Sequence, residues 1–457
     1  MTTHRPATGF AYRNDQFQQI VEDTLALAKT LGASDAGAEV SEGVGLSVSV
    51  RKGELENVER NRDKSLGVSV YLGQRRGNAS TSDFSVAALK QTVQAAYDIA
   101  RFTAEDPAAG LPDGDDLASV DEAARDLDLF HPWTIDAAAA AVLAQRCEDA
   151  AMGVSKRITN SEGAGVSAQQ AHFWAGNSRG FRGGYASSRH YLSVSAITGR
   201  GKGMQRDGWY TSMRSADDLA APEVVGRYAA ERTLARLNSR NVATAEVPVL
   251  FESTVAAGLL GAYVQATSGG ALYRKTSFLV DSLGKRVLAK HIDIVENPHE
   301  LKGKGSAPFD DEGVRTQARK VVKAGVVQGY FLSSYSARKL GMKTTGHAGG
   351  SQNLVMSSRL TEAGDTLDMM LRKLGRGLFV TELMGQGVNY VTGDYSRGAA
   401  GFWVEGGKIV HPVHEVTIAG NLRGMFKDIV AIGADVYNSG SKSVGSLLIG
   451  SMKLAGS

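Results

Sequence analysis

The sequence predicts an α+β protein, with N-terminal α+β domains that contain antiparallel sheet and a β-rich C-terminal domain. Glycine supplies 54 of the 457 residues, well above its usual share of about 7%. These glycines are scattered among short runs of valine, threonine and serine, which is typical of turns and bulges in antiparallel sheet. The chain also exceeds the roughly 250–300 residues that one hydrophobic core usually supports, so we expect two or three domains.

The first predicted domain covers residues 1–106 and has the order helix, strand, strand, helix. Apolar residues at spacings of three and four predict the helices, and alternation of apolar with polar residues predicts the strands. In chain order these elements are a helix that Asn14 can cap and that stops near Gly32, strands that include Leu46–Val50 and Leu66–Val70, and a helix from about Val86.

The second predicted domain covers residues 107–240. It begins with a stretch rich in aspartate, alanine, glycine and proline, which we interpret as a linker that ends near Asp128. The elements expected after it are an alanine-rich helix capped by Thr134 and reaching Gly153, glycine-punctuated strands between residues 157 and 214, and a helix from Pro222 to about Asn238.

The third predicted domain covers residues 241–457. It opens with a strand at Val247–Phe251, and an apolar helix follows at Ser253–Thr267. Glycines then recur every few residues to the C-terminus, which indicates a sheet-rich domain. The further helices expected in it lie near residues 313–324, 334–340, 366–375 and 422–432.

Charge and cysteine content exclude several classes of protein. The net charge is +3, and basic residues alternate with acidic ones, so we expect no nucleic-acid binding. The single cysteine, Cys147, rules out an internal disulfide and indicates a reducing compartment. Because Met1–Phe10 has no apolar signal core and no run of about 18 apolar residues occurs, we expect a cytoplasmic protein without membrane association.

One string has the form of a serine nucleophile motif. Gly176-Asn-Ser-Arg-Gly180 matches Gly-x-Ser-x-Gly, which requires a helix directly after the serine. Phe181-Arg-Gly-Gly184 follows instead, so we interpret the string as a turn between strands. An autonomous hydrolase that uses Ser178 stays as an alternative hypothesis.

The histidines do not have the spacing of a zinc peptidase site. Such sites usually take two histidines from one helix and a third ligand. None of the nine histidines pairs at helical spacing, and the closest two, His411 and His414, are expected on opposite faces of a strand. Cys147 belongs to a helix of the second domain. The sequence therefore predicts no catalytic residue and no metal ligand in this chain.

The most distinctive string runs from Gly387 through Asp394, Tyr395 and Arg397 to Glu405. Asp394 and Arg397 flank a predicted tight turn, where the two side chains could pair. Two interpretations stay open: the three residues provide turn chemistry beside a sheet core, or they line a substrate cleft that binds peptides.

This string resembles the C-terminal domain of the TldD/PmbA peptidase family. The resemblance extends from about residue 20 to the end of the chain. Other segments that agree with the family are the Arg51-Lys-Gly-Glu-Leu-Glu56 run within residues 46–67, Arg274-Lys-Thr-Ser277, Phe309-Asp-Asp-Glu-Gly313 and Lys343-Thr-Thr-Gly-His347.

In this family, TldD-type subunits carry a His-Glu-x-x-x-His motif on the helix that opens the third domain, and a C-terminal cysteine completes their zinc site. The corresponding helix here, Ser253–Thr267, contains neither histidine nor glutamate. The stretch Asn438–Lys442 contains no cysteine. The Tyr-Ser-Arg sequence at 395–397 looks like the PmbA type of subunit, also called TldE.

The resemblance implies a subunit of a cytosolic metallopeptidase complex that is noncatalytic without a TldD-type partner. The partner would hold the zinc, this chain would hold no cofactor, and a homodimer is a further possible assembly. Implied substrates are flexible peptides, including antitoxins and precursors of peptide antibiotics, which would bind by strand addition. The alternative hypothesis is an interaction protein that modulates a nucleic-acid enzyme such as DNA gyrase.

Overall fold

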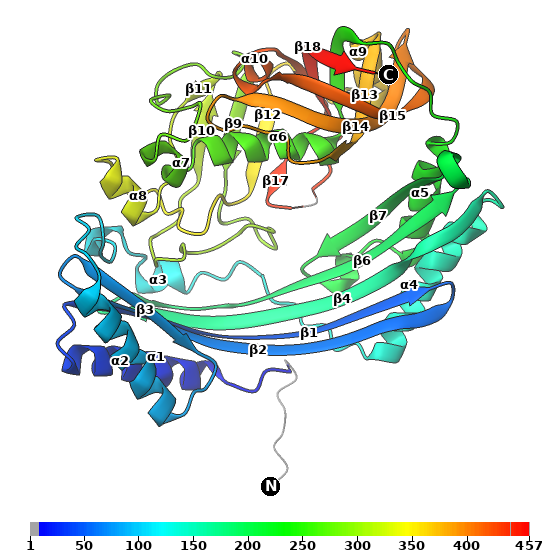
Figure 1. Cartoon of the computed structure of the whole chain (residues 1–457). Helices are drawn as coiled ribbons and strands as arrows, with labels where there is room; N and C mark the ends of the chain where they lie inside the picture. The colour runs from blue at the N-terminus through cyan, green and yellow to red at the C-terminus, as the bar shows by residue number, and fades with distance from the viewer. Residues whose placement is uncertain (1–8, 439, 457) are drawn as a thin grey trace.

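Three sheets form the framework of the molecule in the computed structural model, which describes residues 9–438 and 440–456. The first has seven strands in the order β3-β2-β1-β4-β6-β7, with β5 beside β4. Its strands are β1 (Asp35–Arg51), β2 (Glu54–Leu72), β3 (Arg75–Thr81), β4 (Ile158–Asn177), β5 (Arg182–Gly183), β6 (Ala186–Thr198) and β7 (Gln205–Met213). Figure 1 shows this sheet as a long curved ribbon with the C-terminal domain above its concave face.

The seven-stranded sheet crosses the predicted boundary at residue 106. β1 pairs antiparallel with β2 and also with β4, so that Val48 lies opposite both Val58 and Val166. Strands of the first two predicted domains therefore form one sheet, although each end of it has its own helical layer. The α+β class with antiparallel sheet and a β-rich C-terminal part is confirmed.

Helices cover the convex face of this sheet because alternate strand residues are apolar. At one end α1 (Asn14–Thr30) and α2 (Val86–Phe102) pack on it, and at the other end α4 (Ala137–Gly153) and α5 (Pro222–Ala235) do so. Cys147 is fully buried in the second of these layers. Within the described residues, none of the helices combines the length and apolarity needed to cross a membrane.

The C-terminal domain contains the other two sheets. A six-stranded sheet has the order β15-β14-β13-β8-β18-β16, and a five-stranded sheet has the order β11-β10-β9-β12-β17. Their strands are β8 (Ala245–Phe251), β9 (Ile292–Glu296), β10 (Arg319–Lys323), β11 (Val326–Val327), β12 (Leu354–Ser358), β13 (Gly377–Met384), β14 (Asp394–Glu405), β15 (Lys408–Asn421), β16 (Ile429–Ile432), β17 (Lys442–Ser443) and β18 (Leu447–Ala455).

Five helices accompany these strands in the described part of the C-terminal domain. They are α6 (Ser253–Ala266), α7 (Gly269–Tyr273), α8 (Ser334–Lys339), α9 (Leu367–Leu374) and α10 (Leu422–Lys427). α6 is apolar nearly all round and lies in the largest core of the domain, where Leu260 and Tyr263 are fully buried. In Figure 1, α6 lies on the side of the six-stranded sheet that faces the seven-stranded sheet.

Two predicted helices of this domain are wrong in whole or in part. The segment 313–324 contains strand β10, which Ala324 and Gly325, both at positive φ, connect to β11 in a hairpin. The segment 422–432 is helical only as far as Lys427 and then continues as β16. In both cases a short apolar run was assigned to helix, and periodicity alone does not separate such a run from a strand.

Two predicted caps also differ from the structure by a few residues. Arg13, and not Asn14, occupies the cap position of α1, and Asn14 is the first helical residue. Asp136, and not Thr134, caps α4 by accepting a hydrogen bond from the backbone N–H of Ala139. Asp136 is the better cap because its carboxylate reaches that N–H group at 2.8 Å.

The predicted linker is packed between the sheet and the C-terminal domain. It contains a 3-10 turn (Gly114–Asp116) and the short helix α3 (Val120–Ala123). Leu117 is buried, and the backbone N–H of Ala118 donates to the carbonyl of Gly313 at 2.9 Å. The segment is therefore an ordered contact between the domains.

Candidate functional site

A cavity of about 900 Å³ lies between the concave face of the seven-stranded sheet and the C-terminal domain. Residues of β1, β2 and β4 form one wall, and the segments 103–112 and 309–313 form the others. Because these parts are far apart in the sequence, the cavity depends on the docking of the C-terminal domain. Its volume suits a short, extended peptide or a small molecule, and it excludes a folded domain.

Two carboxylates from opposite sides approach each other in the cavity. Glu39 projects from β1, and Asp311 belongs to the loop after Phe309. Burial between the walls, followed by the charge of Asp311, raises the pKa of Glu39. Burial, followed by the charge of Glu312, raises the pKa of Asp311. Both side chains remain open to the cavity, and no positive charge among the described residues contributes to either pKa.

The loop that carries Asp311 is held by its neighbour Asp310. The buried carboxylate of Asp310 accepts hydrogen bonds from the backbone N–H groups of Glu312, Val314 and Ala348, each at 2.9 Å. Burial raises the pKa of Asp310 to about 7, although these hydrogen bonds oppose that effect. Asp310 therefore has a structural role that fixes the position of Asp311.

An aromatic cluster attaches the C-terminal domain to the sheet beside the cavity. Phe309 inserts its ring among Phe173, Phe181 and Tyr185, at centroid distances of 6.0, 4.9 and 5.7 Å. Gly313 lies against Phe181 at φ +79°, and a Cβ there would come within 2.5 Å of that ring. Edge-to-face packing of this kind stabilises the docked arrangement.

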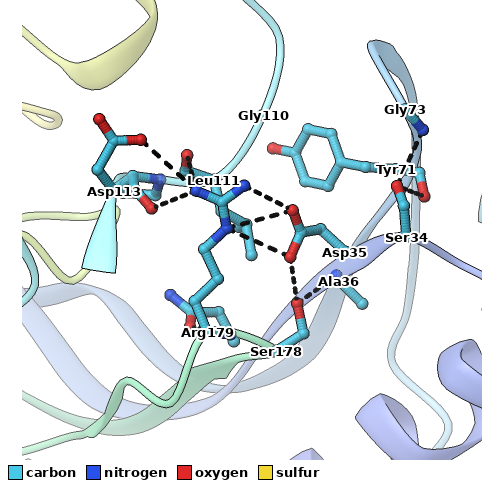
Figure 2. A network of polar contacts seen from close by, with 12 residues as sticks. Ser34, Asp35, Ala36, Tyr71, Gly73, Gly110, Leu111, Asp113, Ser178 and Arg179 are labelled. Atoms are coloured by element: carbon cyan, nitrogen blue, oxygen red, sulfur yellow. Dashed lines mark hydrogen bonds and ion pairs between the residues drawn. The ribbon is translucent and has the colours of Figure 1, made fainter.

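The serine of the Gly-x-Ser-x-Gly string lies in a polar network and not in a nucleophile site. Ser178 occupies the turn between β4 and β5, where its hydroxyl donates to the Asp35 carboxylate at 2.8 Å and accepts from the backbone N–H of Ala36 at 3.0 Å. Figure 2 shows Arg179 beside Asp35, which it binds through Nη2 at 2.8 Å. Arg179 also donates to the carbonyl of Pro112. No described histidine contacts Ser178, so the base of a catalytic triad is missing.

Replacing Ser178 by alanine is expected to lower stability by about 1 kcal/mol, because a partly exposed hydroxyl that makes two hydrogen bonds is lost. Any peptide hydrolysis measured for the wild-type chain is expected to be the same for the variant. Urea unfolding and a peptidase assay check both statements. If hydrolysis disappeared while the urea midpoint moved only slightly, the serine-hydrolase hypothesis would be right.

Helix α8 of the C-terminal domain contacts the segment 106–113 from the side opposite Arg179. Arg338 donates to the carbonyls of Gly110 and Leu111, at 3.1 and 2.5 Å. Tyr335 and Lys339 both bind the Asp106 carboxylate at 2.7 Å. These contacts close one end of the cavity, because the segment 106–113 is clamped between the sheet and α8.

The predicted residues Asp394, Tyr395 and Arg397 lie together on β14 and do not line the cavity described above. Asp394 accepts from the Thr392 hydroxyl at 2.6 Å and from Asn421 at 3.0 Å, and these bonds lower its pKa. The predicted pairing of Asp394 with Arg397 is wrong, because strand geometry directs the two side chains to opposite faces.

Tyr395 and Arg397 share the other face of β14. The Tyr395 side chain is buried, and its hydroxyl has no hydrogen-bond partner among the described residues. The Nε atom of the half-buried Arg397 is likewise without a partner there. Whether these residues contact a peptide stays a prediction.

Helix α6 offers no zinc ligand among its solvent-facing side chains. The positions of α6 that reach solvent are Thr254, Val255, Ala257, Gly258, Gly261, Val264 and Gln265, and none of these side chains is a usual zinc ligand. In residues 9–438 and 440–456, no group of three histidine, cysteine, aspartate or glutamate side chains could hold a metal. His411 and His414 lie on β15, and His4 falls outside the described residues.

The sequence analysis did not predict the two carboxylates of the cavity. Glu39 and Asp311 are separated by most of the chain, and only the docking of the two domains brings them together. The family-like string at 309–313 was the one signal that could have drawn attention to Asp311.

Comparisons with known proteins match nearly the whole chain to a single family. Profiles of the PmbA/TldA metallopeptidase match in three parts: domain 1 at residues 37–100, the central domain at 130–237 and the C-terminal domain at 244–456. Metalloprotease PmbA from Escherichia coli is 49% identical over 96% of this chain and 97% of its own length. A Metalloprotease PmbA homolog from Haemophilus influenzae is 46% identical over 97% of both chains.

Solved structures of similar fold include a proposed modulator of DNA gyrase from Bacteroides thetaiotaomicron. It has a TM-score of 0.90 and 26% identity and covers 97% of this chain and 100% of its own. TldE from Thermococcus kodakarensis has a TM-score of 0.81 at 18% identity and covers 96% of this chain and 100% of its own. The second likeness concerns the fold alone.

Proposed function

Because the chain belongs to the PmbA/TldD metallopeptidase family, we propose that it is the metal-free, PmbA/TldE-like subunit of a peptidase complex. A TldD-type partner subunit would hold the zinc and carry out the hydrolysis. The observation that carries this proposal is α6, whose solvent-facing positions are occupied by small, aliphatic and amide side chains instead of metal ligands.

The role of this chain in the complex would be to bind and present peptides. Extended strands with free edges, β3 and β7 of the large sheet among them, offer backbone groups to an extended peptide. The cavity of about 900 Å³ favours flexible peptides over folded proteins. Antitoxins and precursors of peptide antibiotics fit this requirement, because such chains are unfolded or easily unfolded. We further expect the complex to work in the cytoplasm.

Metal analysis of the isolated chain tests the proposal directly. The protein purified alone is expected to contain no stoichiometric zinc and to cleave no flexible peptide. Tight zinc in the isolated protein, together with peptide cleavage that a chelator abolishes, would contradict the proposal.

A second candidate function is modulation of a nucleic-acid enzyme. It is favoured only by the description of the Bacteroides thetaiotaomicron structure as a proposed modulator of DNA gyrase. The small net charge of +3 does not support direct DNA binding. Salt-sensitive DNA binding in a mobility-shift assay would favour this second candidate.

A further inference from the structure

Small residues surround Glu39 on the sheet wall of the cavity. Glu39 on β1 lies directly opposite Gly67 of β2 and Ala175 of β4, and all three line the cavity. Residues opposite one another in a sheet project to the same face. A Cβ on Gly67 would meet no described atom within 4 Å, so the space beside the Glu39 side chain is open. The Glu39 carboxylate is therefore accessible to a ligand in the cavity.

The docking of the C-terminal domain brings Asp311 to the same part of the cavity. A Cβ on Gly183 of β5 would come within 2.8 Å of the Phe309 ring, so this ring packs directly on the sheet. Gly183 pairs with Ala175, the residue opposite Glu39. Asp311 follows Phe309 by two residues and also lines the cavity. Strand register and ring packing therefore place the two carboxylates on facing walls of one space, which agrees with the effect of the Asp311 charge on the pKa of Glu39.

Neither carboxylate has a partner in the part of the chain that the structure describes. Both side chains are exposed to the cavity, and no hydrogen bond or ion pair joins Glu39 or Asp311 to a described donor. The carboxylate of Asp106, which also lines the cavity, is by contrast bound by Tyr335 and Lys339 at 2.7 Å. Two of the cavity's carboxylates are therefore free to bind a ligand.

A positive side chain on the cavity wall is held by other groups. Arg76 of β3 donates through Nε to the Asn78 side chain at 3.0 Å and through Nη2 to the Ser69 hydroxyl at 3.2 Å. Its guanidinium also packs over the Tyr71 ring at 5.8 Å. The charge of Arg76 contributes to the pKa of neither free carboxylate. The negative charge of the two carboxylates is thus left without a counter-ion among the described residues.

A buried amide on the same wall has an unused donor. Asn177 at the end of β4 lines the cavity and is 3% exposed. Its Oδ1 atom accepts from the backbone N–H groups of Arg179 at 3.0 Å and Phe181 at 3.2 Å, which fixes the orientation of the amide. Its Nδ2 atom has no partner among the described residues, although buried donors are nearly always paired. Asn177 lies opposite Gly37, two residues before Glu39 on the same face of the sheet.

We propose that this part of the cavity binds a positively charged group of the peptide, either its N-terminal ammonium or a basic side chain, between Glu39 and Asp311. In this arrangement Asn177 donates to a nearby carbonyl of the peptide backbone. The inference rests on the proposed function, because it assumes that peptides occupy the cavity. It assigns a substrate preference that the fold alone does not specify.

The chemistry of the site suits an organic cation. Ammonium and guanidinium groups carry several N–H donors and form charge-assisted hydrogen bonds with carboxylates, which are stronger than neutral ones. A bound cation also removes the repulsion between the two carboxylates. A calcium or magnesium ion would need about six oxygen ligands or more, and the described residues contain no group of three side chains that could hold a metal.

The test uses the full chain without a partner and three unlabelled decapeptides of serine, glycine and valine, all with an amidated C-terminus. The first has a free N-terminal ammonium, the second is N-acetylated, and the third is N-acetylated with one central lysine. Isothermal titration calorimetry at neutral pH is expected to give about tenfold tighter binding of the first, the third or both than of the second. Which of the two cationic peptides is preferred identifies the source of the charge.

Variants of single carboxylates supply the controls. Glu39→Gln and Asp311→Asn are each expected to abolish the preference for cationic peptides and, since neither carboxylate has a described partner, to leave the urea midpoint unchanged. Glu59→Gln is the matched control, because Glu59 is exposed on β2 opposite Ser47 and does not line the cavity. Equal affinity of the wild-type chain for all three peptides, or no measurable binding of any, would overturn the proposal. A preference that survives in Glu39→Gln or in Asp311→Asn would do the same.

The uncharged second peptide tests the role of Asn177. Asn177→Asp keeps the oxygen that accepts from the two backbone N–H groups and lacks the amide donor. It is expected to weaken the binding of this peptide by about fivefold, because one hydrogen bond is lost. Unchanged affinity for the second peptide would overturn the assignment of Asn177 to the site.

The assay requires neither zinc nor hydrolysis, so its failure is distinguishable from failure of the proposed function. A chain that contains no zinc yet binds all three peptides equally would keep the proposed function and lose this inference.

Discussion

Replacing Glu296 by alanine is expected to lower the free energy of unfolding by about 3–5 kcal/mol, the range found when one partner of a buried ion pair is removed. The Glu296 side chain on β9 is completely buried. Its carboxylate accepts hydrogen bonds from Arg319 Nε at 2.7 Å, from the His347 ring at 2.9 Å and from the backbone N–H of Gln352 at 2.7 Å. The variant leaves all three donors without this acceptor in the interior of the C-terminal domain.

The same group has a predictable pH dependence. Burial alone would raise the pKa of Glu296, but the hydrogen bond from His347 and the charge of Arg319 outweigh it, so the pKa lies below its usual value of 4.5. A carboxylate with a lowered pKa in the folded state stabilises the protein above its unfolded-state pKa. This contribution is lost as the pH falls below about 4.5 and through the lowered folded-state pKa.

Urea unfolding of the wild-type chain, Glu296→Ala and Glu300→Ala measures the effect. Glu300 is exposed on the loop after β9, so its replacement is expected to change stability by no more than about 0.5 kcal/mol. The wild-type chain is expected to lose its advantage over Glu296→Ala in acid. Equal losses for the two variants at neutral pH would show that the buried carboxylate contributes no more than a surface one.

Replacing Arg232 by alanine is the second change with a large expected effect, about 3 kcal/mol of stability. Arg232 on α5 binds Glu252 at 2.6 Å and Asp207 at 3.3 Å, and all three side chains are at most 15% exposed. Glu252 directly precedes α6, so this contact joins the sheet and its helices to the C-terminal domain. The Arg232 guanidinium also packs over the Trp209 ring at 5.1 Å.

Loss of Arg232 leaves Glu252 partly buried without a cation, whereas Asp207 still has Arg236 at 2.9 Å. Burial lowers the pKa of Arg232, but Glu252 reverses this effect and raises the pKa overall. The variant is therefore expected to loosen the contact between the domains and to increase proteolysis in the segment 238–244.

Limited proteolysis and urea unfolding of Arg232→Ala and Arg227→Ala check this expectation. Arg227 lies on the same helix but is exposed, so its variant is expected to behave like the wild-type chain. Unchanged proteolysis and an unchanged urea midpoint in Arg232→Ala would mean that Arg232 contributes little to the docking and that other contacts, such as the aromatic cluster around Phe309, maintain it.

Local patterns in the sequence predicted most elements of the fold. Alternation around Leu46 and Leu66 identified β1 and β2, and the uninterrupted apolar run after Ser253 identified α6. The helix predicted at 313–324 was wrong, because the adjacent buried residues Val321 and Val322 fit either class of element. Local patterns have no information on which strands pair, so the sheet that joins β1 with β4 was not predicted.

The candidate site was less predictable than the fold. The absence of histidine and glutamate from α6 could be found from the sequence, because the resemblance to the TldD/PmbA family identified the helix that carries these residues in TldD-type subunits. The two carboxylates of the cavity could not be found from the sequence, since Glu39 and Asp311 are neighbours only after the domains dock. Asp394 and Arg397 are close in sequence, yet strand geometry separates their side chains.

The most direct test of the proposed role is a titration of this chain into a fixed amount of a TldD-type partner from the same organism. The rate of cleavage of a flexible peptide is expected to rise and to reach a plateau near equimolar subunits, with zinc bound in proportion to the partner alone. This chain without the partner is expected to show no cleavage. A partner whose full activity does not depend on this chain, or zinc-dependent cleavage by this chain alone, would contradict the assignment of a metal-free presenting subunit.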